Sequence, residues 1–146
     1  MSNDVRRVTK RCEELLRDPA LNKGSAFTPE ERAALGLEGL LPPAVSSLEG
    51  QIERVMNNLH GKPKPLEQYI YLRTLQDRNE TLFHATLIAY LEELAPIVYT
   101  PTVGEAVQRF SHIFRGSRGL FITPENIGHI DRTLSCAVQD EVGIIV

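Results

Sequence analysis

The 146-residue sequence contains no tryptophan, two cysteines and no long apolar run. Every apolar stretch is far shorter than the roughly 20 residues that a membrane-spanning helix needs. The N-terminal residues Met1-Ser2-Asn3-Asp4 are polar and lack the apolar core of a signal peptide. These absences predict a protein without membrane contact and with a cytoplasmic location.

Cysteine is too sparse to build a framework of disulfides. Cys12 and Cys136 are far apart in the sequence, and both fall on apolar faces of predicted helices. We interpret them as small buried hydrophobic residues in a reducing compartment rather than as a disulfide pair.

Motifs for metal and nucleotide binding are also missing. No histidine has a second histidine or a carboxylate at a ligand-like spacing; the four histidines are His60, His84, His112 and His129. The sequence has no Gly-x-Ser-x-Gly nucleophile turn and no P-loop. Gly116-Ser117-Arg118-Gly119 lacks the preceding strand of a dinucleotide fingerprint. We therefore predict no metal site and no cofactor-binding residues in this chain.

Positive charge is not concentrated anywhere on the chain. The net charge is −3 and the pI is about 5.8. A small N-terminal basic cluster is interrupted by acids and is typical of a solvated helix face; its members are Arg6, Arg7, Lys10 and Arg11. Because nucleic-acid binding needs a larger basic patch, no nucleic-acid partner is expected.

Helical spacing of apolar residues recurs along the chain and predicts a mainly α fold. Thr28-Pro29-Glu30-Glu31 and Thr123-Pro124-Glu125 are strong helix starts, each with an N-cap residue, a proline and an acid. Ser46 or Ser47, and Asn79, are predicted to cap two further helices. The predicted helices cover residues 3–18, 29–35, 48–60, 66–76, 80–96, 103–114 and 124–138.

Two apolar segments have the composition of strands. Leu120-Phe121-Ile122 is short, and Val142-Gly143-Ile144-Ile145-Val146 is β-branched and predicted to be buried on both faces. A strand buried in this way needs neighbours on both sides. We therefore expect the sequence to stop within a domain.

The segment Tyr99-Thr100-Pro101-Thr102-Val103-Gly104 joins two predicted helices and puts a phenol at their junction. Pro101 favours an extended backbone before it, and Thr102 with Glu105 is predicted to form a capping box. Tyr99 would then lie in a fixed loop, where functional residues are common. The residues alone leave two interpretations open: a buried tyrosine that closes a helix corner, or a chemical group.

Seven blocks of the sequence together match one family pattern: Asn22-Lys23-Gly24-Ser25-Ala26-Phe27, Glu31-Arg32, Leu37 with Gly39-Leu40-Leu41-Pro42-Pro43, Tyr69-Ile70-Tyr71-Leu72-Arg73, Gln76-Asp77-Arg78-Asn79-Glu80-Thr81-Leu82-Phe83, Pro96-Ile97-Val98-Tyr99-Thr100-Pro101-Thr102-Val103-Gly104-Glu105-Ala106 and Arg118-Gly119-Leu120-Phe121-Ile122. In these blocks the sequence resembles the N-terminal domain of malic enzymes, the NAD(P)-dependent decarboxylating malate dehydrogenases. The resemblance implies a mainly α fold with a helical domain over residues 22–141 and an N-terminal helix within 1–21 that contacts other subunits. Residues 142–146 would form the first strand of a following α/β region.

The resemblance implies a catalytic role for Tyr99. In this family the tyrosine of the Tyr-Thr-Pro-Thr-Val-Gly motif is a general acid, which protonates the enol left when oxaloacetate loses carbon dioxide. An unperturbed phenol has a pKa near 10 and needs a nearby cation to act at neutral pH. The family supplies a lysine from a later segment. The parent enzyme would use malate, NAD or NADP, and Mg²⁺ or Mn²⁺, whereas residues 1–146 alone are predicted to be inactive.

The resemblance also implies a role for two arginines. Some animal members are activated by fumarate at a dimer interface, and the two arginines of that site match Arg54 and Arg78. The assisting glutamate matches Ser46, which is a departure. We interpret the pair either as an allosteric carboxylate site or as interface salt bridges.

Two alternatives to oxidative decarboxylation stay open at this point. A malolactic-type enzyme would convert malate to lactate without net oxidation. A purely structural oligomerisation module is the other alternative, because this region builds subunit contacts in the family. In either case a homo-oligomer, dimer or tetramer, is expected.

Overall fold

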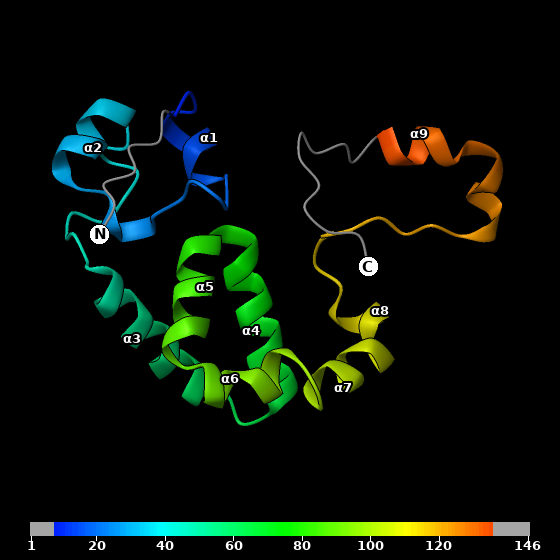
Figure 1. The fold of residues 1–146 in the computed structure, drawn as a ribbon. Helices are drawn as coiled ribbons and strands as arrows, with labels where there is room; N and C mark the ends of the chain where they lie inside the picture. Colours follow the sequence, from blue (N-terminus) through cyan, green and yellow to red (C-terminus); the bar gives the residue numbers. More distant parts are fainter. Residues whose placement is uncertain (1–7, 136–146) are drawn as a thin grey trace. The chain divides into compact units, whose positions relative to one another are not determined.

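The computed structural model describes residues 8–135, and every regular element in that range is helical (Figure 1). The chain divides into two units, and the boundary in the sequence lies between residues 114 and 115. The predicted mainly α fold is confirmed. The predicted domain boundaries after residues 21 and 141 stay predictions. The predicted strand 142–146 and Cys136 lie outside the described residues.

A small apolar cluster holds the N-terminal part of the first unit together. This part contains α1 (Cys12–Leu16) and α2 (Pro29–Leu35). Leu15, Phe27 and Leu37 are almost fully buried against one another. Burying a side chain of this size contributes about 1.5–3 kcal/mol, and partly buried apolar residues, among them Leu16, Leu21 and Leu41, pack against the cluster.

The start and end of α2 follow the sequence prediction. The Thr28 hydroxyl accepts the Glu31 N–H, and the Glu31 carboxylate accepts the Thr28 N–H at 2.9 Å, which completes a capping box. The helix ends at Gly36, which has a φ of +71°. Glycine adopts this left-handed conformation without a side-chain clash.

The helix predicted over residues 3–18 is wrong in its extent. Within the described residues α1 begins only at Cys12, where φ is +52°, and residues 8–11 are not helical. Lys10 forms an ion pair with Asp18 at 2.7 Å across this short helix. The turn at Cys12 removes its side chain from the apolar face. Cys12 is therefore an exposed free thiol, and the prediction that it is buried is wrong.

Four helices form the main core of the first unit: α3 (Leu48–His60), α4 (Pro65–Arg78), α5 (Glu80–Ala89) and α6 (Leu91–Val98). α4 and α5 lie side by side, α3 packs on α5, and α6 packs on α4 and α5 (Figure 1). The core side chains recur at helical spacing on the facing sides; they are Val55, Met56, Leu59, Leu72, Leu75, Leu82, Phe83, Leu94 and Ile97.

Predicted caps begin two of these helices. The Ser47 side chain accepts the N–H of Gly50 at the start of α3. Asn79 Oδ1 accepts the N–H of Leu82 at 2.9 Å at the start of α5. Each bond satisfies a backbone donor that the first helical turn leaves without a partner.

The single helix predicted from Asn79 to about Pro96 is wrong, because two helices occupy this range. Tyr90 leaves the helical conformation between α5 and α6, and the chain bends there by 119°. The bend lets apolar residues of both helices reach one core. Tyr90 and Leu91, at the bend, are exposed although both are large apolar residues.

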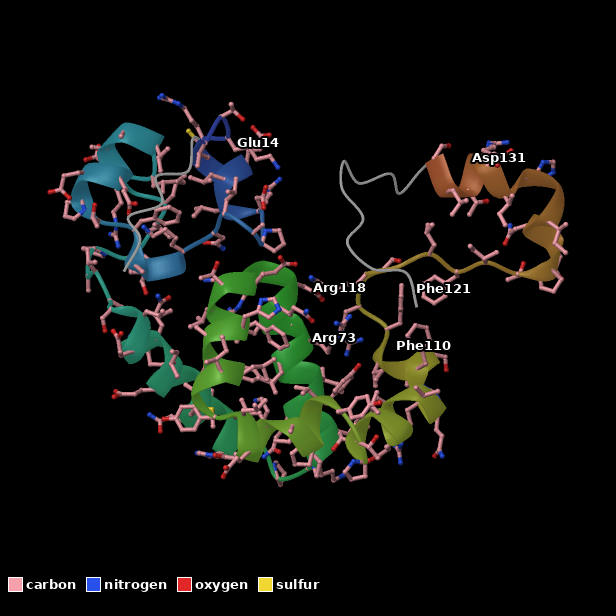
Figure 2. The ribbon with its side chains drawn as sticks, in the orientation of Figure 1. Glu14, Arg73, Phe110, Arg118, Phe121 and Asp131 are labelled. Atoms are coloured by element: carbon pink, nitrogen blue, oxygen red, sulfur yellow. The ribbon has the colours of Figure 1, made fainter. Side chains whose placement is uncertain are left out.

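The helix predicted over residues 103–114 is also divided. α7 covers Thr102–Gln108 and α8 covers Phe110–Ile113, and Arg109 lies between them. Ala106 is buried, whereas the apolar side chains of Val107, Phe110 and Phe114 are exposed (Figure 2 labels Phe110).

The second unit is described over residues 115–135. Residues 115–122 have no regular structure, so the strand predicted at 120–122 is wrong. Three residues are too few to form a strand without a partner. The predicted helix start at Thr123 is followed by a 3₁₀ helix over Pro124–His129 and by α9 (Ile130–Ser135), which carries Asp131 (Figure 2).

No single helix among residues 8–135 is long and apolar enough to cross a membrane. One bent pair, Glu80–Ala89 with Leu91–Gln108, reaches the required length and composition when its two arms are combined.

We predict that the charge of Glu31 stabilises the fold at neutral pH but not in acid. Burial raises the pKa of this carboxyl, but hydrogen bonds from Lys23 and from the Thr28 N–H outweigh it, so the pKa lies below its ordinary value. A lowered folded-state pKa adds stability above the unfolded-state pKa of about 4.3, and this stability is lost as the pH falls through the folded value. Glu31→Gln, which keeps the capping acceptor, should lower the free energy of unfolding at pH 7 and have little effect at pH 3.

Urea unfolding at several pH values measures this difference. Glu38→Gln is the control, because Glu38 is exposed and should give a small, pH-independent change. A Glu31→Gln effect of equal size at pH 7 and pH 3 would contradict the prediction.

Candidate functional site

Tyr99 lies between α6 and α7, and its side chain is 71% exposed. Its N–H donates to the carbonyl of Ala95 at 2.9 Å, and its own carbonyl accepts the N–H of Val103 at 2.8 Å. The backbone is therefore tied to both helices while the phenol faces solvent. The interpretation of Tyr99 as a buried residue closing a helix corner is wrong.

Thr102 holds this junction in a way that the sequence did not predict. It is the first residue of α7, it is buried, and its hydroxyl donates to the carbonyl of Pro96 at 2.7 Å. The predicted capping box with Glu105 is therefore wrong, and Glu105 instead pairs with Arg109 at 3.2 Å. The Thr100–Pro101 peptide bond is cis. The buried hydroxyl keeps the end of α6 and the start of α7 together around Tyr99.

Arg54 of α3 and Arg78 of α4 line one pocket of about 280 Å³. Both residues are exposed, and neither forms an ion pair with a carboxylate among residues 8–135. The pocket lining contains no aspartate or glutamate; its other polar members are Asn22, Gln51, Asn58, Tyr71 and Asn79. Two guanidinium groups without an acid favour a carboxylate or phosphate ligand.

The loop before α2 ties the pocket to the N-terminal part of the unit. Asn22 Nδ2 donates to the carbonyl of Arg78 at 2.9 Å and to that of Leu16 at 3.0 Å. Ser25 Oγ accepts a hydrogen bond from Arg54 Nη2 at 3.2 Å. Each arginine is therefore held by a residue of this loop, Arg78 through its backbone and Arg54 through its side chain.

Close packing at Gly24 fixes the same loop against α3. Gly24 has a φ of +56°, and a Cβ added there would lie 3.0 Å from Gln51 Oε1. Gln51 is buried, and its Nε2 donates to the carbonyl of Lys23 at 3.4 Å. Sequence reasoning placed this segment in a loop but gave it no function. Asn22 and Gly24, two residues apart, were the available signal, since both residue types are common where the backbone turns sharply.

Arg73, a third arginine of the first unit, lies outside this pocket. Arg73, on α4 (Figure 2), donates to Gln76 Oε1 at 2.6 Å and lines a separate pocket of about 120 Å³. Among the residues that the structure describes, no group of three or more His, Cys, Asp or Glu side chains could hold a metal ion.

The fold and this pocket define a helical domain with two arginines in the wall of one pocket. Residues 76–146 match the family model of the malic enzyme N-terminal domain. This range contains Tyr99 and Arg78, whereas Arg54 precedes it.

Similarity to individual proteins extends over more of the chain. It is 52% identical over 132 residues to proteins named NAD-dependent malic enzyme from Idiomarina loihiensis, Pectobacterium carotovorum and Photorhabdus laumondii. Each alignment covers 90% of this chain and 24%, 23% and 23% of the respective relative. The chain thus belongs to the malic enzyme family. It spans about a quarter of the length of the curated relatives it matches.

Proposed function

We propose that this chain is part of an NAD-dependent malic enzyme. In the net reaction malate is oxidised and decarboxylated to pyruvate and carbon dioxide, and NAD⁺ is reduced to NADH. The identity of 52% to proteins that carry this name is the observation that supports the proposal most directly.

Tyr99 is the proposed general acid. Loss of carbon dioxide from the keto acid leaves an enolate whose terminal carbon must gain a proton. The phenol O–H supplies that proton and takes a replacement from solvent afterwards. The exposure of the side chain and the hydrogen bonds at both ends of its backbone support this role. A general acid must be reachable by the substrate and must also be held in position.

The described residues do not fit a divalent metal ion or a dinucleotide. They contain no acidic cluster that could hold a metal and no glycine-rich turn between a strand and a helix. We therefore assign no step within residues 8–135 to either group. We propose that the whole protein holds both groups elsewhere and that the 146-residue chain alone is inactive.

The role of Tyr99 can be measured in a chimera in which this chain replaces the matching part of the Idiomarina loihiensis relative. With malate, NAD and Mn²⁺ the chimera should produce NADH and pyruvate. Tyr99→Phe should lower kcat about 10²–10⁴-fold, the usual contribution of a general acid. Tyr90→Phe is the matched control, because Tyr90 is also an exposed tyrosine at a helix junction.

Three outcomes would count against these proposals. An unchanged kcat in the Tyr99→Phe chimera would remove the general-acid role. Lactate formed without NADH would instead identify a malolactic-type reaction. NADH production by the 146-residue chain alone, above that of its Tyr99→Phe variant, would show that the chain is active by itself.

We further propose that Arg54 and Arg78 form a carboxylate-binding site. Both line the same pocket, no acid lies in its wall, and no described carboxylate neutralises either guanidinium. Fumarate is the dicarboxylate that we propose as its probe. A hydrogen bond to a charged group contributes about 1.5–3 kcal/mol, or roughly 10- to 150-fold in affinity.

Titration calorimetry of the 146-residue chain tests this site. Arg54→Met and Arg78→Met should each weaken fumarate binding about tenfold or more. Arg17→Met is the control, because Arg17 pairs with Glu13 outside the pocket. No binding to the wild-type chain, or equal binding to the variants, would rule out the site.

We also propose that the chain forms a homo-oligomer through the segment that leads into α3. Large apolar side chains are exposed there, including Leu40, Val45 and Leu48. Sedimentation equilibrium at micromolar concentration should give a dimer or larger species for the wild-type chain. Leu48→Asp should shift it to monomer, whereas Ile88→Asp on α5 should not. A monomeric wild-type chain would overturn this proposal.

A further inference from the structure

Arg32 is a buried arginine whose hydrogen-bond partners are all backbone carbonyls. It is 7% exposed and lies in α2, outside the pocket lining. No carboxylate among residues 8–135 forms an ion pair with it. Because burying a charge is costly, the carbonyl dipoles around it must be well placed to compensate.

The carbonyls come from both sides of α2 in the sequence. Nε donates to Phe27 O at 2.8 Å, and Nη1 donates to Pro42 O at 2.7 Å. Longer bonds run from Nη1 to Pro43 O and from Nη2 to the carbonyls of Ser25 and Ala44, at 3.3–3.4 Å. The Arg32 guanidinium thus binds the segment before α2 and the segment after it through their backbone carbonyls.

Ser25 connects this cation to the pocket. Its carbonyl accepts both from Arg32 Nη2 at 3.3 Å and from the N–H of Ser46 at 3.0 Å. Its hydroxyl accepts from Arg54 Nη2 at 3.2 Å, which is the one hydrogen bond of this guanidinium to a side chain among the described residues. With the Ser25 carbonyl held by two donors, the direction of its side chain toward α3 is also restricted.

We propose that Arg32 is a positioning residue that aims Arg54 into the pocket through Ser25. This inference rests on the proposed carboxylate site, and it adds a residue outside the pocket to its function. Lysine cannot replace Arg32, because an ammonium group cannot reach carbonyls on both sides of α2 with the geometry of a guanidinium fork.

Fumarate titration of the 146-residue chain provides the first test. Arg32→Lys should weaken binding about tenfold and Ser25→Ala about fivefold, as expected for loss of one orienting contact. The double variant should be no weaker than Arg32→Lys alone, because both substitutions break the same connection. Leu37→Val, which loosens the same N-terminal apolar cluster without touching Ser25, should leave the affinity unchanged.

A second measurement does not depend on a ligand. Phenylglyoxal labelling, followed by quantitative peptide mass spectrometry, reports how freely each arginine side chain reacts. The labelling rate of Arg54 should rise about equally in Arg32→Lys, Ser25→Ala and the double variant, while that of Arg17 in the same samples stays constant. Leu37→Val should leave the Arg54 rate unchanged.

The two measurements separate the two proposals. If the wild-type chain does not bind fumarate but the Arg54 labelling rises as expected, the carboxylate site is wrong and the positioning role stands. If the Arg54 rate is unchanged in Arg32→Lys, or if the affinity losses of the two single variants multiply in the double variant, the positioning role is overturned.

Discussion

The packing of α3, α4, α5 and α6 around buried leucines is the constraint on which both candidate sites depend. Leu59, Leu72, Leu75 and Leu94 are each at most 1% exposed. Arg54 precedes a core residue of α3, and Arg78 lies one turn after a core residue of α4. The two arginines therefore line one pocket at the edge of the packed faces. The same core fixes α6 and, through it, the junction that carries Tyr99.

Local signals predicted the helix starts well. The caps at Thr28, Ser47 and Asn79 each form within three residues of the capped N–H, so the sequence nearby contains all that is needed. Two predictions failed because the deciding contacts lie outside the local pattern: the single helix through Tyr90 and the capping box at Thr102. The break at Tyr90 lets apolar residues of two helices share one core. The Thr102 hydroxyl was predicted to accept the Glu105 N–H, but it donates to the carbonyl of Pro96 in the preceding helix instead.

The candidate site was predictable only in part. Resemblance to a family selected Tyr99, Arg54 and Arg78, and the structure places both arginines in one pocket. The role of the loop at residues 22–25 was not predictable, because its contacts join residues 56 and 29 positions apart in the sequence. Arg32 was equally hidden. Its partners are backbone carbonyls, which every residue possesses and which no side-chain pattern can mark.

The amide of Asn22 has a mechanical consequence for the first unit. It joins the end of α1 to the end of α4 through two carbonyls, and Ser25 joins the same loop to α3. An anion bound by both arginines would connect α3 and α4 next to the hydrogen bonds of Asn22 and Ser25. Because Asn22 and Gly24 also line the pocket, undocking of the N-terminal segment would remove part of the pocket wall, and occupancy of the pocket would oppose it. Anion binding and the attachment of the N-terminal segment would thus be thermodynamically linked.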